Sequence, residues 1–93
     1  MQATQATAER TPDLVNVRCT DWEGLRHADL DDVVRDATVG EIVDEARRTM
    51  GLPMDTSYQA VLDGRQLNHM ETLEEAGIDS DVEMEIVPDV HAG

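Results

Sequence analysis

The clearest pattern of hydrophobic and polar positions lies between residues 38 and 53, where apolar side chains recur every three or four positions. This spacing places them on one face of an α-helix and leaves the opposite face polar. The apolar positions are Val39, Ile42, Val43, Ala46 and Met50. The pattern therefore predicts an amphipathic helix that must pack against another surface.

Both ends of this helix are marked in the sequence. Thr38 followed by Glu41 has the spacing of a capping box, in which each side chain binds the backbone amide of the other residue. Gly51 can adopt the left-handed conformation that ends a helix, and Pro53 prevents its continuation. The predicted helix thus runs from just after Thr38 to just before Gly51.

The segments on either side of the helix alternate between apolar and polar residues, a pattern that predicts strands. Asp63-Gly64 is a two-residue hairpin signal and predicts a short returning strand at 65–67. A second capping-box pattern begins at Thr72 and predicts a single helical or 3₁₀ turn that ends at Gly77. The main strands are expected at 14–19, 28–34, 58–62 and 82–87.

The predicted strand at 28–34 has an irregular pattern. Leu30 and Val33 are separated by an odd number of positions, so they would point to opposite faces of a regular strand. Both are apolar and are expected to face the core. We therefore expect a β-bulge or a register shift in this strand.

Charge is the unusual feature of the composition. The 93 residues include 21 acidic and 7 basic side chains, all seven basic ones are arginine, and the formal net charge is −14. An acidic, lysine-free chain is typical of proteins that work in multimolar salt, where the Debye length falls to about 3 Å and repulsion between carboxylates is screened. We interpret the composition as that of a cytoplasmic protein from a halophile; the alternative is an acidic protein that lacks lysine by chance.

The same composition excludes several classes of function. Nothing forms a basic patch, which argues against nucleic acids and anionic membranes as partners. Neither a membrane-spanning apolar run nor a secretory signal is visible. The single Cys19 excludes an intramolecular disulfide and fits a reducing compartment, where a small core residue is a better interpretation than a nucleophile.

Catalytic and metal-binding patterns are also missing. The three histidines, His27, His69 and His91, lack metal-ligand spacing. The aspartates between 29 and 36 lack the glycine and the final glutamate of a calcium loop, and a solvated acidic surface explains them better. We therefore expect no enzyme activity, no bound metal and no bound cofactor.

The order of the predicted elements, taken with three local motifs, resembles the ubiquitin-like β-grasp family. The helix and its Gly51-Leu52-Pro53 exit look like ubiquitin's helix and its Gly-Ile-Pro exit. Residues 63–67 are similar to ubiquitin's Ala-Gly-Lys-Gln-Leu turn, and Thr72-Leu73 with Gly77-Ile78 resembles the segment before ubiquitin's last strand. The resemblance implies an α+β fold in which a mixed four- to five-stranded sheet packs on one main helix, in the order ββαββ(3₁₀)β.

The resemblance also implies domain limits and a function like that of small archaeal ubiquitin-like modifiers. A β-grasp domain at 14–88 would lie between a disordered tail at 1–13 and a flexible C-terminal tail at 89–93. Gly93 falls on the terminal glycine that an E1-like enzyme activates with ATP and joins to lysines of target proteins. Ala92 departs from the usual penultimate glycine. The alternatives are a sulfur carrier with a thiocarboxylate on Gly93, and a non-conjugated binding domain.

A second feature implied by the resemblance is a partner-binding patch. Val61 and Val87 fall on the outward positions of ubiquitin's apolar recognition patch, and Leu25 lies in the loop that completes it. Scattered apolar residues are also normal on protein surfaces, which is the alternative interpretation. A monomer is expected, and because the chain has no lysine, we expect it to be attached to targets singly and not as isopeptide-linked chains.

Overall fold

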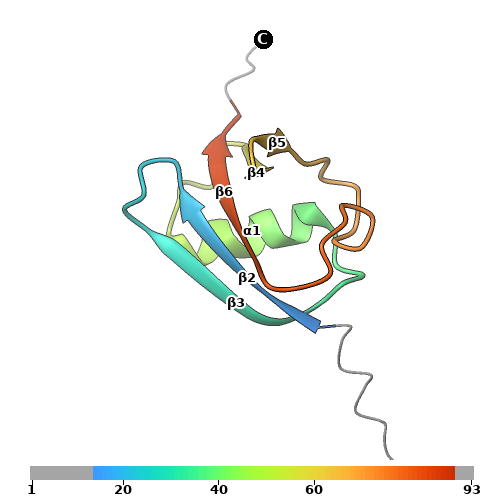
Figure 1. The fold of residues 1–93 in the computed structure, drawn as a ribbon. Coiled ribbons are helices and arrows are strands. Elements are labelled where there is room, and N and C mark those ends of the chain that lie inside the picture. Colours follow the sequence, from blue (N-terminus) through green and yellow to red (C-terminus); the bar gives the residue numbers. More distant parts are fainter. Residues whose placement is uncertain (1–13, 90–93) are drawn as a thin grey trace, which may run out of the picture.

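A computed structural model of the protein describes residues 14–89, which form one five-stranded sheet and one helix (Figure 1). The strands lie in the order β3-β2-β6-β4-β5, with β2 and β6 parallel and the other neighbours antiparallel. This is the mixed sheet expected from the sequence. Its two longest strands form an antiparallel hairpin at one side of the sheet. The elements are β2 (Leu14–Asp21), β3 (His27–Val34), α1 (Val39–Met50), β4 (Tyr58–Leu62), β5 (Arg65–Gln66) and β6 (Val82–Pro88).

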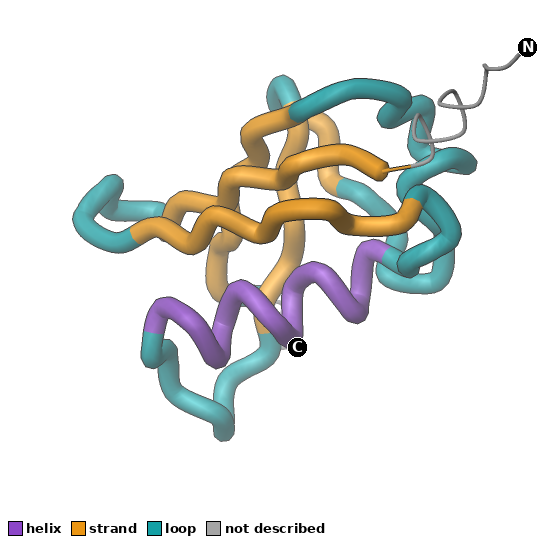
Figure 2. Tube along the Cα trace, turned by 90° about the horizontal axis from the view of Figure 1, so that it is seen from below, coloured by secondary structure: helices purple, strands orange, loops and turns teal. Residues whose placement is uncertain are grey.

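Helix α1 lies across one face of the sheet, and the core fills the space between them (Figure 2). All five apolar positions predicted for the helix are buried. They meet the inward side chains of the central strands, among which Val17, Cys19, Ala60, Met84 and Ile86 are at most 2% exposed. The other face of the sheet carries the polar half of each strand's alternation and remains uncovered by α1.

The predicted helix ends are confirmed. The Thr38 hydroxyl accepts a hydrogen bond from the backbone N–H of Glu41 at 3.2 Å, and the Glu41 carboxylate accepts one from the Thr38 amide at 3.0 Å. At the other end Gly51 has a φ of 72°, in the left-handed region that glycine adopts without strain. These local signals fix where α1 begins and ends.

The irregularity predicted for the second strand is a bulge in β3. Val15 pairs with Val33 but Val17 pairs with Leu30, so β3 carries one extra residue across this step. Asp32 takes up the difference with a φ of 56°. As a result Leu30 and Val33 both pack, partly buried, against the core.

The connection between β4 and β6 also follows the sequence prediction. Asp63 and Gly64 both have positive φ, the conformation of a tight hairpin turn between β4 and β5. Thr72 and Glu75 exchange both hydrogen bonds of a capping box, at 2.9 and 3.1 Å, in a single hydrogen-bonded turn. β5 is one residue shorter than predicted, although the Leu67 amide still donates to the Ala60 carbonyl at 2.9 Å.

The end of the domain differs from the sequence prediction at Asp89, which was assigned to a flexible tail. Its backbone N–H donates to the Ser57 carbonyl at 2.8 Å, and its carboxylate accepts a hydrogen bond from the Gln59 amide at 2.9 Å. Pro88 lacks an N–H but still lies opposite Tyr58, so the β4–β6 alignment continues past it. The chain is therefore held to the sheet as far as Asp89.

Candidate functional site

The uncovered face of the sheet carries the predicted partner-binding patch. On β4 and β6 the inward positions are Ala60, Met84 and Ile86, so the alternate residues point outward. Val61 and Val87 are among these outward residues, and both are half-buried. The structure thus places the two valines on the same face of neighbouring strands.

The two valines are diagonal neighbours and do not lie directly opposite each other. Val61 pairs with Glu85, and Val87 pairs with Gln59. The exposed carboxylate of Glu85 therefore lies beside the apolar pair, and Glu83 occupies the next outward position along β6. The patch is a small apolar area bordered by acidic side chains.

Leu25, the third predicted member of the patch, lies in the loop between β2 and β3. Its side chain is 77% exposed. It lines a pocket together with Pro88, the residue after Val87, whereas Val61 is not part of that pocket. Leu25 is thus a neighbour of the end of β6, at the point where the chain leads toward its last residues.

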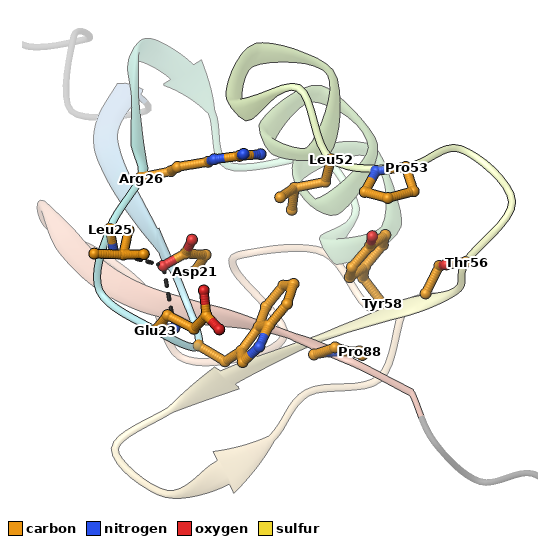
Figure 3. Close-up of a pocket in the computed structure, with 10 residues that line it drawn as sticks. Asp21, Glu23, Leu25, Arg26, Leu52, Pro53, Thr56, Tyr58 and Pro88 are labelled. Carbon is orange, nitrogen blue, oxygen red and sulfur yellow. Dashed lines mark hydrogen bonds between the residues drawn. The ribbon is translucent and has the colours of Figure 1, made fainter.

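This pocket has a volume of about 370 Å³ and lies between the β2–β3 loop, the exit of α1, the start of β4 and the end of β6 (Figure 3). The sequence prediction did not include it. Its walls are mostly apolar, and its charged members come from the end of β2 and the loop that follows. The lining residues used below are Asp21, Trp22, Glu23, Arg26, Tyr58 and Pro88.

Two aromatic rings line the pocket, and they are the only tryptophan and tyrosine of a chain that has no phenylalanine. The ring centroids of Trp22 and Tyr58 are 6.1 Å apart with an interplanar angle of 28°, a stacked arrangement. Tyr58 is 3% exposed, whereas Trp22 keeps 40% of its surface accessible. The buried tyrosine therefore supports an indole ring that remains open to solvent.

Asp21 organises the loop that forms one wall. It is the one charged residue among the buried positions of residues 14–89, and its carboxylate accepts hydrogen bonds from the amides of Leu25 at 2.9 Å and Glu23 at 3.2 Å. Burial alone would raise the pKa of Asp21, but the hydrogen bonds from the loop amides, led by that of Leu25, outweigh it and lower the pKa below 3.8. Asp21 is thus an anion at neutral pH.

The other two charged residues of the pocket are placed differently. The Arg26 side chain extends toward Leu52 (Figure 3). Its guanidinium donates to the Met50 carbonyl at 3.3 Å, at the C-terminal end of α1. The Glu23 carboxylate lies on the same side of the pocket as Asp21 (Figure 3). It has neither a hydrogen bond nor an ion pair to any other residue in the described part of the chain.

The remaining sequence predictions fall elsewhere. Ala92 and Gly93, the predicted activation residues, lie outside the described residues. Cys19 is fully buried in the core as predicted, and burial, aided by the negative charge of Asp29, raises the pKa of its thiol to about 12. Within residues 14–89 the acidic, histidine and cysteine side chains form no cluster that could hold a metal ion. The same range contains no helix long and apolar enough to cross a membrane.

The pocket was missed because its residues are far apart in the sequence and only the fold brings them together. The position of the single tryptophan, in the loop between two predicted strands, was the one available signal. The stacking of Trp22 on the buried Tyr58 places the indole at the edge of the core, and part of the ring remains open to solvent.

Comparison with known proteins shows which solved structures resemble this fold. Neither family models nor curated protein sequences give a match. Among solved structures, a ubiquitin from Caldiarchaeum subterraneum superposes with a TM-score of 0.70 and 25% identity, over 86% of this chain and 99% of the other. A de novo designed protein based on ubiquitin gives a TM-score of 0.71 and 26% identity, over 88% and 94%.

A third structure, described as molecular mimicry of SUMO that promotes DNA repair, gives a TM-score of 0.68 over 81% of this chain and 91% of the other. Its identity of 10% bears on the fold alone. The three neighbours superpose on this chain with TM-scores between 0.68 and 0.71, which shows that they share its fold. The chain therefore has the ubiquitin-like β-grasp fold.

Proposed function

We propose that this chain is a ubiquitin-like protein modifier, activated at Gly93 by an E1-like enzyme and joined to lysines of target proteins in a high-salt cytosol. The observation that carries the proposal is the structural likeness to an archaeal ubiquitin, with a TM-score of 0.70 over 99% of that protein's length. The proposal adds Gly93 at the position of ubiquitin's terminal glycine. It needs no cofactor on this chain, because the activating enzyme would use the ATP.

The anchoring of β6 supports this proposal. Asp89 is hydrogen-bonded to Ser57 and Gln59, so the described part of the chain ends at a fixed point at the edge of the domain. Four residues extend at most about 14 Å. An enzyme that acts on the Gly93 carboxylate would therefore have to approach closely the end of the sheet where Leu25 and Pro88 lie.

The experiment is a pulldown of the N-terminally tagged protein from a halophilic archaeal host, beside a variant that lacks Gly93. A modifier gives high-mass bands that survive denaturation and disappear with the deletion. A thiocarboxylate on Gly93 without such bands would favour the sulfur carrier. If neither product is found, the proposal fails.

Sites of attachment require a protease chosen for this sequence. Trypsin cleaves after arginine or lysine, and the last such residue before Gly93 is Arg65, so it would leave a long remnant on the target. A protease that cleaves before aspartate would leave residues 89–93 on the modified lysine. A His91→Arg variant allows the attachment sites to be checked with trypsin, because cleavage after the new arginine would leave only Ala92-Gly93 on the modified lysine.

A non-conjugated binding domain is the second candidate, and the outward pair Val61 and Val87 favours it. An outward-facing apolar pair on adjacent strands, here half-buried, is a surface that a partner can cover. On this alternative, Val61→Asp or Val87→Asp abolishes partner capture while removal of Gly93 has no effect. The modifier predicts that removal of Gly93 abolishes the covalent products.

A further inference from the structure

We propose that the pocket between the β2–β3 loop, the α1 exit and the end of β6 binds an arginine side chain presented by a protein partner. The pocket combines an open indole ring, an unpaired carboxylate and a buried anion within one concave surface. This proposal stands whether or not Gly93 is conjugated.

The aromatic wall supplies the first part of the recognition. Trp22 keeps 40% of its surface accessible although its ring stacks on Tyr58, which is 3% exposed. Tryptophan is also the aromatic side chain whose face attracts a guanidinium most strongly.

Charge supplies the second part. Asp21 and Glu23 place two carboxylates on one side of the pocket, and Asp21 stays ionised because the loop amides bind it. The one cation of the lining, Arg26, is directed to the Met50 carbonyl instead of to these carboxylates. The net charge of −14 adds to the preference for a cationic ligand and opposes an anionic one.

These features select arginine over lysine. A guanidinium is planar, so it can stack on the Trp22 indole while its edge donates to the Glu23 carboxylate. An ammonium group is a strongly hydrated point charge that does not stack in this way. The pocket volume of about 370 Å³ is at the lower end of the ~300–1,000 Å³ of ligand sites, which suits one side chain and not a larger ligand.

The test is an NMR titration of the ¹⁵N-labelled protein with the blocked tripeptide acetyl-Gly-Arg-Gly-amide, at the lowest salt concentration that keeps the amide spectrum dispersed. The matched probe replaces arginine with citrulline, which has nearly the same shape but no charge. We expect shifts at the Trp22 indole N–H and the amides of residues 22–26, with a dissociation constant of about 1–10 mM, a weak affinity appropriate to a single side chain.

Variants separate the two parts of the recognition. Glu23→Gln should weaken binding about two- to fivefold, the value of one exposed ion pair. Trp22→Leu should weaken it about fivefold or more, while Trp22→Phe should retain most of it. The control is Glu74→Gln, which changes the net charge equally; Glu74 is exposed in the turn that contacts the region before α1, at the other end of the helix from Met50.

Several results would overturn the proposal. Citrulline and arginine peptides that bind equally would remove the role of charge. A loss of affinity in Glu74→Gln as large as in Glu23→Gln would reduce the effect to general attraction by an acidic protein. Stronger binding of acetyl-Gly-Glu-Gly-amide would assign the pocket to an anion through Arg26. If Trp22→Leu fails to fold, Trp22→Phe and the citrulline comparison still decide the question.

Discussion

The buried carboxylate of Asp21 accepts a hydrogen bond from the backbone N–H of Leu25 at 2.9 Å, whereas the side chain of Leu25 is 77% exposed. An acid at the end of β2 thus holds in place the loop that presents the most exposed member of the predicted patch. The same loop carries Trp22 and Glu23, so one hydrogen-bonded anion positions residues of two candidate surfaces.

We predict that Asp21→Ala lowers the thermal midpoint of the domain and increases the mobility of the loop at 22–26, because the amides of Glu23 and Leu25 lose their acceptor. Asp21→Asn should be milder, since the amide oxygen can still accept. Thermal unfolding by circular dichroism and amide hydrogen exchange would measure these effects. A stable Asp21→Ala variant with unchanged exchange at Leu25 would contradict the prediction.

This contribution should depend on pH in a defined direction. The pKa of Asp21 is lower in the folded protein than its ordinary value of 3.8, so folding favours the ionised form. The stabilisation is complete above 3.8 and is lost as the pH falls through the lowered folded pKa. The stability difference between the wild type and Asp21→Asn should therefore be constant near neutral pH and shrink below 3.8.

The β3 bulge gives a prediction about side-chain shape. Asp32 has a φ of 56°, and its amide donates to the Asn16 side chain at 3.0 Å. A β-branched residue is strained in this conformation, whereas glycine is not. Asp32→Val should be less stable than Asp32→Gly by about 1–2 kcal/mol in urea unfolding. Equal stabilities would mean that the bulge relaxes when the side chain changes.

The fold was predictable because its local signals agree with its tertiary packing. The spacing of Val39, Ile42, Val43, Ala46 and Met50 predicted the buried face of α1, and all five residues are buried. Even the irregularity of β3 was predictable, since Leu30 and Val33 could both face the core only if an extra residue intervened.

Features that depend on contacts between distant segments were not predictable. Asp21 is a typical turn residue in sequence terms, yet it is the buried last residue of β2, because it pairs with Ile86 of the distant strand β6. The pocket brings together Trp22, Tyr58 and Pro88 from three separate segments. The outward position of Val61 and Val87 followed from strand alternation, but the placement of Glu85 directly opposite Val61 needed the strand register.

We also predict that the stability of the domain increases with salt. With 21 acidic and 7 basic residues, most carboxylates cannot be paired with an arginine, and repulsion among them opposes the compact state. The Debye length falls from about 10 Å at 0.1 M to about 3 Å at 1 M ionic strength, which screens this repulsion. The thermal midpoint should rise with KCl concentration. Equal midpoints and equally dispersed amide spectra at low and multimolar salt would contradict this.

The absence of lysine leads to the last prediction, which concerns conjugates if the proposed function holds. Self-linked isopeptide chains need an ε-amino group on the modifier, and none of the 93 residues supplies one. Arg65 occupies the place of ubiquitin's turn lysine, and its guanidinium donates to the Ala76 carbonyl at 3.1 Å. We therefore expect each attachment site on a target to carry a single copy of 10.3 kDa.

Gel mobility alone cannot test this, because single copies on several lysines of one target also produce a ladder. The decisive measurement is peptide mass spectrometry after cleavage before aspartate, where the 89–93 remnant should occur on target lysines and never on a residue of this chain. A remnant on Met1 or on a hydroxyl of this chain would refute single attachment. In the Arg65→Lys variant, a remnant on the new lysine would indicate that self-linked chains are absent from the wild type only because it has no ε-amino group.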